Sequence, residues 1–148
     1  MKRTYRLHGL ERRRARALEE CRLSLARAVN ARVAAEGQVQ RLRRDEERTR
    51  QALLREIGDP VALKMWSEMA DAHRRARTGA VAQLGNAHAA EASAREAVTV
   101  SHQQLRVLER LRERIEEEAR MEAARAEERE LNDRNAGRHA RRMLSEGM

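Results

Sequence analysis

The sequence predicts an all-α protein in which two long helices form an antiparallel coiled-coil hairpin, the second helix being the longer. Charged residues make up 38% of the 148-residue chain and aromatic residues only 1%, so few large apolar side chains are available for a globular core. Much of the hydrophobic content is alanine, which has the highest helix propensity. A chain rich in Ala, Glu, Arg and Leu with a single proline is typical of long helices.

The first helix is expected from about residue 10 to 57, where Gly37 is the only glycine and proline is absent. Apolar residues recur there at alternating spacings of three and four, which keeps one stripe facing a partner helix. Arg32 and Glu46 interrupt the stripe. Because the spacing persists for about five heptads, it predicts a coiled coil. The stripe comprises Leu18, Cys21, Leu25, Ala28, Ala35, Val39, Leu42, Thr49 and Leu53.

A turn is predicted at residues 58–60. Gly58 suits the left-handed conformation that often follows a helix end, and Pro60 has the backbone φ of a first helical turn. Asp59 is the expected N-cap of the second helix, because its side chain accepts hydrogen bonds from the free amides of the first turn. A tight turn between long helices predicts an antiparallel pair.

The second helix is expected from about residue 61 to 142, with short disordered segments at both chain ends. Gly79 and Gly85 are expected to bend it without ending it, since an isolated glycine costs only about 1 kcal/mol. At about 1.5 Å per residue the helices would measure roughly 70 and 120 Å, so the first covers the second only to about residue 110. Beyond Ile115 apolar residues become sparse, which predicts an unpaired charged helix. The expected stripe is Leu63, Trp66, Met69, Ala70, Ala76, Ala80, Leu84, Ala87, Val98, Leu105, Leu108, Leu111 and Ile115.

The charge balance is basic, with 32 Lys and Arg against 24 Asp and Glu and a net charge of +8. Such a charge suits acidic protein surfaces, nucleic acid or anionic lipid. Acidic residues interleave with the arginine clusters, and no aromatic platform is available for base stacking, so nucleic acid is not the expected partner. A single cysteine excludes an internal disulfide and fits a reducing cytoplasm. No apolar window approaches the ~20 residues of a transmembrane helix.

No catalytic, cofactor or metal site is predicted. The five histidines are scattered and form neither an HExxH pair nor a Cys/His cluster with zinc spacing. No glycine-rich nucleotide loop is present. Glu116, Glu117 and Glu118 cannot converge on one ion, because consecutive helical residues point about 100° apart. Cys21 lies at a heptad core position and is interpreted as a small buried hydrophobic residue.

The layout resembles FliJ, the small coiled-coil protein of the flagellar export apparatus, and its relatives in virulence type III secretion machines. A basic first helix is followed by a turn glycine and then a tryptophan, here Gly58 and Trp66. The length and the arginine-rich tail fit as well, and the resemblance covers nearly the whole chain. The late segment carries the family's charged signature in Leu111, Glu113, Arg114, Arg125, Leu131, Asn132 and Asp133.

The resemblance implies a non-enzymatic central stalk that inserts into the hexameric export ATPase ring, stimulates the ATPase and links it to the export gate. The gate contact would be made by an FlhA-type protein, and export chaperones would also be partners. The family's gate-binding positions match Gln38 and Leu42, whereas Asp45, Thr49 and Ala72 stand where relatives often have aromatics. The expected location is cytoplasmic, peripheral to the inner membrane at the flagellar base. The residues expected at the ATPase ring are Glu113, Arg114, Arg125, Leu131, Asn132 and Asp133.

The residues also agree with two other functions. One is a basic helical hairpin that binds nucleic acid or the ribosome, whose affinity would fall steeply with salt. The other is a coiled-coil scaffold without an ATPase partner. Neither residue spacing nor composition separates a flagellar from a virulence apparatus, although the long tail and the tryptophan after the turn favour the flagellar one.

Overall fold

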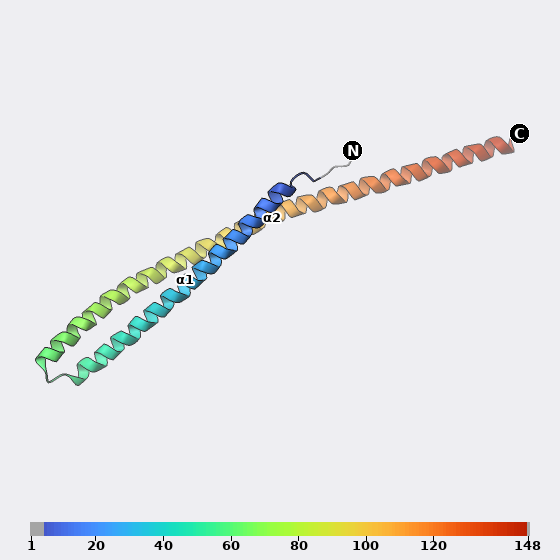
Figure 1. Ribbon diagram of the computed structural model, residues 1–148. Helices are drawn as coiled ribbons and strands as arrows, with labels where there is room; N and C mark the ends of the chain where they lie inside the picture. The colour runs from blue at the N-terminus through green and yellow to red at the C-terminus, as the bar shows by residue number, and fades with distance from the viewer. Residues whose placement is uncertain (1–4, 148) are drawn as a thin grey trace. The chain divides into compact units, whose positions relative to one another are not determined.

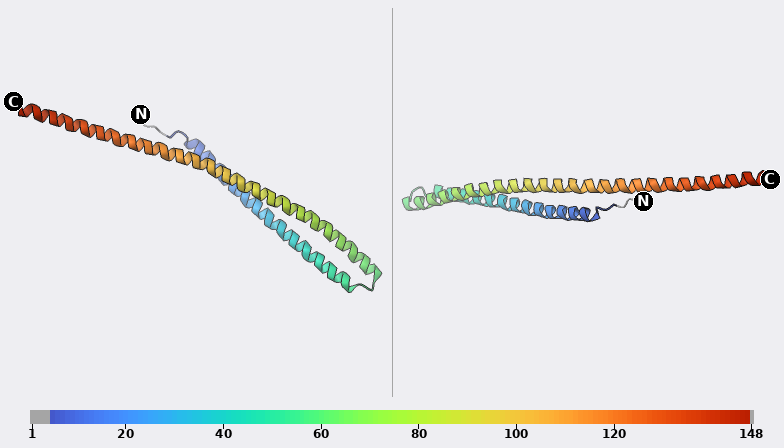
Figure 2. Two further views of the ribbon diagram at one scale, coloured as in Figure 1. Left: turned by 180° about the vertical axis from the view of Figure 1, so that it is seen from behind. Right: turned by 90° about the horizontal axis from the view of Figure 1, so that it is seen from above.

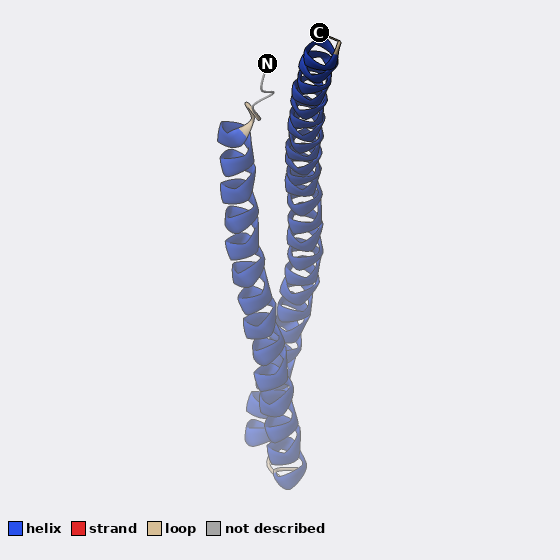
Figure 3. Cartoon of the chain, turned by 90° about the vertical axis from the view of Figure 1, so that its right-hand side faces the viewer, coloured by secondary structure: helices blue, strands red, loops and turns tan. Residues whose placement is uncertain are grey.

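The computed structural model describes residues 5–147, and within that range the chain consists of two α-helices and no strand (Figure 1, Figure 3). Helix α1 spans His8–Arg55 and helix α2 spans Pro60–Glu146, with 48 and 87 residues. The all-α class and the longer second helix are therefore confirmed. The disorder expected at the ends concerns in part residues 1–4 and 148, which lie outside the described residues. Helix α2 runs past residue 142 because no helix-breaking residue follows before Gly147.

The turn between the helices differs from the expected one at Gly58. No described residue has a positive φ, so Gly58 does not adopt the left-handed conformation. Instead, two backbone hydrogen bonds between residues three apart in sequence close the turn. The Glu56 amide donates to the Leu53 carbonyl (3.2 Å), and the Asp59 amide donates to the Glu56 carbonyl (3.1 Å). Asp59 accepts hydrogen bonds from the amides of Val61 (3.0 Å) and Ala62 (3.4 Å) through Oδ1, the geometry of an N-cap.

The chain divides into two compact units. The hairpin unit is Arg16–His102, and the terminal unit is Met1–Ala15 with Gln103–Met148. In the hairpin unit α1 and α2 lie side by side in opposite directions, as the views of Figure 1 and Figure 2 agree. Each unit is thus stabilised by contacts between segments that are distant in sequence.

In the hairpin unit, one face of α1 packs against α2 at every predicted stripe position. Leu18, Val39 and Thr49 are buried there, and the remaining stripe residues are partly buried. Arg32 and Glu46 lie on the same face and are also partly buried, so the two apparent interruptions belong to the interface. We call the paired faces of α1 and α2 the seam.

The seam of α2 differs in part from the expected stripe. Met69 and Leu111 are 40% and 38% exposed, and Ala76 is exposed as well. These three were wrongly included, because they lie one position away from the strict three-four spacing. Polar residues occupy seam positions instead, and Glu91 is only 6% exposed. The partly or fully buried seam residues that the stripe omitted are His73, Arg77, Glu91, Ala94, Ser101 and Arg112.

In the terminal unit, Tyr5 lies over the start of α1. It is buried, its ring meets the His8 ring edge-on at 4.8 Å, and its hydroxyl donates to the Leu108 carbonyl (3.3 Å). Burial and the neighbouring Glu11 carboxylate raise the pKa of Tyr5. Arg112 pairs with Glu11 at 2.6 Å. These contacts join the beginning of α1 to the middle of α2.

After Ala119, every residue of α2 is exposed, and so is Gly147, which follows the helix. In both views of Figure 2, α2 continues as a helix past the N-terminal end of residues 5–15. We call residues 120–147 the tail. None of the helices within residues 5–147 has a stretch long and apolar enough to cross a membrane.

Candidate partner-binding surfaces

The described residues contain no group of three His, Cys, Asp or Glu side chains that would hold a metal ion. Cys21 is partly buried on the seam, with its Sγ 3.4 Å from the Ser101 Oγ across the helices. The three consecutive glutamates after Ile115 each pair with an arginine on the same helix. The pairs are Glu116 with Arg112, Glu117 with Arg120 and Glu118 with Arg114, at 3.9, 2.7 and 3.9 Å. This acidic run is a solvated, ion-paired face.

The residues expected at an ATPase ring are all exposed on α2. Glu113 and Leu131 are five helical turns apart and therefore lie on one line along the helix. Arg114, Arg125 and Asn132 fall within about 20° of one another on a second line, about 100° around the helix from the first. Together with Asp133 they span about 30 Å of helix. The structure thus places these residues on one continuous, accessible stretch.

Charge is unevenly distributed along this exposed part of α2. Residues 113–133 carry nine acidic residues and four arginines, whereas residues 134–142 carry four arginines and no acidic residue. Arg134 pairs with Glu130 (2.5 Å) at the border between them. An acidic stretch followed by a basic end offers two electrostatically distinct surfaces on one helix.

The two expected gate-binding residues lie one turn apart on α1 in the hairpin unit. Gln38 is exposed, and its Oε1 accepts hydrogen bonds from Arg41 Nη2 (2.8 Å) and Nε (3.3 Å). Leu42 is partly buried on the seam. Thr49 is buried, with its hydroxyl donating to the Asp45 carbonyl (2.9 Å), so an aromatic residue there would have to replace a seam contact.

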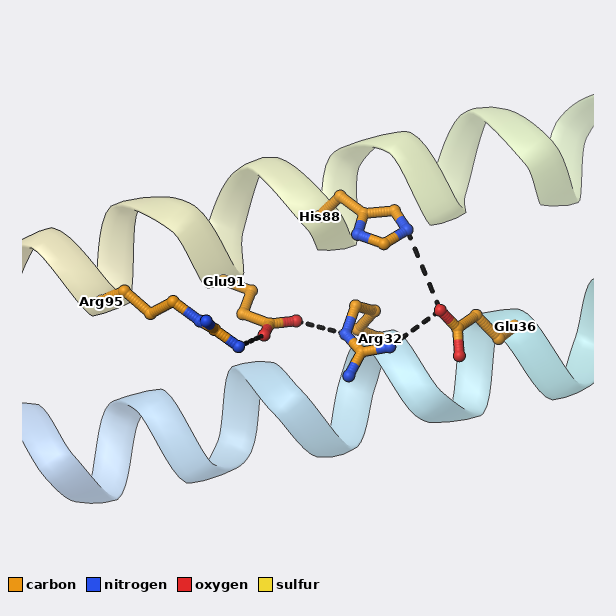
Figure 4. A network of polar contacts seen from close by, with 5 residues as sticks. All are labelled: Arg32, Glu36, His88, Glu91 and Arg95. Atoms are coloured by element: carbon orange, nitrogen blue, oxygen red, sulfur yellow. Dashed lines mark hydrogen bonds and ion pairs between the residues drawn. The ribbon is translucent and has the colours of Figure 1, made fainter.

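Sequence reasoning missed the polar network at the centre of the hairpin unit (Figure 4). The Arg32 Nε donates to the Glu91 carboxylate across the seam, and Arg95 binds the same carboxylate at 2.6 Å. Arg32 also pairs with Glu36 at 2.8 Å, and the His88 Nε2 lies 3.9 Å from the Glu36 Oε1. The network thereby satisfies a buried carboxylate with two guanidinium groups.

The electrostatics of this network follow from its contacts. Burial acts to raise the pKa of Glu91, but the hydrogen bonds from Arg95 and Arg32 outweigh it, so the pKa lies below the usual range. Hydrogen bonds to Glu36 and then Glu91 raise the pKa of Arg32. Both shifts favour the charged forms of Glu91 and Arg32.

A second cross-helix ion pair joins Glu46 to Arg77 (3.1 Å). Arg32 and Glu46 are two heptads apart on α1, as are Glu91 and Arg77 on α2, so both pairs belong to one antiparallel register. The strict three-four spacing could have identified these residues, because it places Glu91 and Arg77 on the seam if polar residues are counted as well as apolar ones. These contacts position the helices; they form no catalytic constellation.

A helical hairpin with a polar seam and a long exposed charged helix defines a coiled-coil protein. The model of the family described as "Flagellar FliJ protein" matches residues 1–144. The chain belongs to the FliJ family. No curated protein and no solved structure matches it. It is therefore a component of the flagellar export apparatus, and its partners belong to that apparatus, as the resemblance implied.

Proposed function

We propose that this chain is the central stalk of the flagellar export ATPase. In this role α2 enters the hexameric ATPase ring, promotes its assembly and hydrolysis, and couples it to the export gate. The observation that carries the proposal is the tail, in which every residue is exposed although the helix is unbroken. Because this segment is exposed on all sides, its whole circumference is accessible to a surrounding partner such as a ring.

The surface chemistry of α2 supports a role as a stalk. Exposed ion pairs contribute about 0–1 kcal/mol each, so contacts between a charged helix and a ring exchange easily. A strongly apolar helix would instead bind one ring subunit tightly and resist exchange. The residues proposed to meet the ring are Glu113, Arg114, Arg125, Leu131, Asn132 and Asp133.

The hairpin unit is proposed to bind the FlhA-type gate protein through Gln38 and Leu42. The side chain of Gln38 is accessible, while Leu42 offers only the edge of its side chain beside the seam. Escort chaperones of late export substrates complete the proposed partners. The protein would act without enzymatic activity of its own, in the cytoplasm and peripherally at the inner membrane.

The ring contact is tested with the purified chain and the export ATPase of the same organism, measuring ATP hydrolysis and hexamer assembly. The wild-type chain is expected to raise both. Arg114→Glu with Arg125→Glu reverses two charges on one line of α2 and should abolish most of the stimulation. Arg120→Glu with Arg138→Glu makes the same charge change on a different line and should retain it. Equal loss in both variants would contradict a specific ring contact.

The gate contact is tested by binding the chain to the isolated cytoplasmic domain and linker of the gate protein. Gln38→Ala should weaken binding by several-fold, because the exposed amide and its ordering of Arg41 are lost. Gln40→Ala, also exposed but on another face of α1, is the matched control. Unchanged binding by the Gln38 variant would place the gate contact elsewhere. Retention of export chaperones on the immobilised chain tests the third proposed partner.

A further inference from the structure

The seam spacing of α2 continues beyond the residues that pair with the start of α1. The same three-four spacing that runs through Glu91, Arg112 and Ile115 continues beyond Ala119 into the tail. At these positions the tail has alanines, one methionine and three charged residues, whereas the paired part also has leucine, valine and isoleucine. The tail therefore keeps the spacing of the seam, although no described residue covers it. The continued seam positions are Glu122, Ala126, Arg129, Asp133, Ala136, Ala140 and Met143.

The three Arg and Glu residues on the paired part of the α2 seam have opposite charges across from them. In the hairpin unit Glu91 faces Arg32 and Arg77 faces Glu46; in the terminal unit Arg112 faces Glu11. The tail has three charged seam residues, Glu122, Arg129 and Asp133. Among the described residues these three make no ion pair, so the tail retains a pattern of unmatched seam charges.

We infer that, outside the ATPase ring of the proposed function, the tail pairs with the tail of a second copy of this chain, antiparallel and with Arg129 of each copy opposite Asp133 of the other. Both unmatched charges are then neutralised twice, because the two-fold symmetry repeats each contact. In this register Ala126 faces Ala136 of the second copy, and small residues let the helices approach closely. Charge complementarity at the seam thus selects a second copy as the occupant.

The same register also accounts for the length of the tail. It places Ala119, the last partly buried residue, opposite Met143 of the second copy, and Glu122 opposite Ala140. Every seam position of the tail is therefore covered. The adjacent antiparallel register would place Glu122 opposite Asp133 of the second copy, so that like charges meet twice. It would also place Met143 opposite Arg112 of the second copy, which Glu11 already pairs.

The first test is sedimentation equilibrium of the full chain at low salt over a range of concentrations. The wild-type chain should dimerise reversibly. Arg129→Asp alone and Asp133→Arg alone each create two like-charge contacts, so each should raise the dimer dissociation constant about tenfold. The double variant restores opposite charges in the same places and should return to within about threefold of wild type.

Arg138→Asp is the matched control, because residue 138 lies on the outer face of such a pair and its reversal should leave dimerisation unchanged. Since all these positions are exposed in the single chain, the helix content by circular dichroism should be equal for all variants. If the wild-type chain stays monomeric up to about 0.1 mM, its self-affinity is far below that of stable dimers, and the inference is overturned. A double variant as weak as the single ones would also overturn it.

The second test fixes the register by disulfide formation in a Cys21→Ser background. Ala126→Cys and Ala136→Cys are made in separate chains, which are mixed under mild oxidation. The proposed register brings these two positions together, so the mixture should form a cross-linked dimer. Each variant alone should not, because residue 126 then meets alanine 136. Cross-linking of either variant alone to the same extent as the mixture, or no cross-linking of the mixture, would contradict the proposal.

Discussion

Replacing Leu18 with alanine should destabilise the hairpin unit far more than the same change at Leu23. Leu18 lies on the seam and is 4% exposed, whereas Leu23, five residues later on α1, is 58% exposed. Leu18→Ala removes about three buried carbon atoms at about 0.8 kcal/mol each. The space left at a two-helix seam opens to water, so the added cavity cost is at the low end of the known range. We expect a loss of about 2–3 kcal/mol.

At Leu23 less than half of the side chain leaves water on folding, so Leu23→Ala should cost below about 1 kcal/mol. Leucine and alanine both favour helix, so the backbone contribution is small and similar at the two sites. Urea and thermal unfolding followed by circular dichroism measure both variants, and Leu18→Ala should lower the midpoint temperature by about 5–10 °C. Equal effects of the two changes would refute the assignment of α1's buried face.

Three further predictions follow from single contacts. Because the pKa of Glu91 is lower in the folded chain, its contribution to stability is complete above its ordinary pKa of about 4.3 and is lost as pH falls through the lowered value. The difference in urea midpoint between wild type and Glu91→Gln should therefore shrink on acidification, and a constant difference would contradict the network. Asp59→Ala should cost about 1 kcal/mol through loss of the helix cap, whereas Asp59→Asn should stay close to wild type in the same unfolding assay. Ile115→Asp should release the start of α1 in the terminal unit, seen as faster amide hydrogen exchange at residues 8–15, and Leu111→Asp on the exposed side should not.

The first helix could be read from the sequence because its seam follows one unbroken frame. Arg32 and Glu46 also lie at three-four positions, although they interrupt the apolar pattern. The second helix was harder, because apolar residues adjacent to the frame, such as Met69, count equally in a search for hydrophobic stripes. Whether a charged residue is tolerated on a seam depends on the residue opposite it. That partner is known only once the register of the two helices is fixed.

The candidate binding residues could be placed on a helix from the sequence, and their accessibility followed from the shortage of apolar residues after Ile115. The positions of the six expected ATPase-ring residues around α2 also follow from the helical repeat. The Tyr5 contact with Leu108 could not be foreseen. It joins a residue before α1 to a backbone carbonyl of α2, and no side-chain pattern encodes such a bond.

The two cross-helix ion pairs of the hairpin unit have opposite polarity, since α1 contributes the arginine in one and the glutamate in the other. If the nascent helices met two heptads out of step in one direction, Arg32 would face Arg77. In the other direction, Glu46 would face Glu91. Alanine side chains pack similarly in several registers, so packing in an alanine-rich seam does not prevent such misalignment. The alternation of sign rejects both, so a chain of low sequence complexity folds into one hairpin among several that its apolar spacing allows.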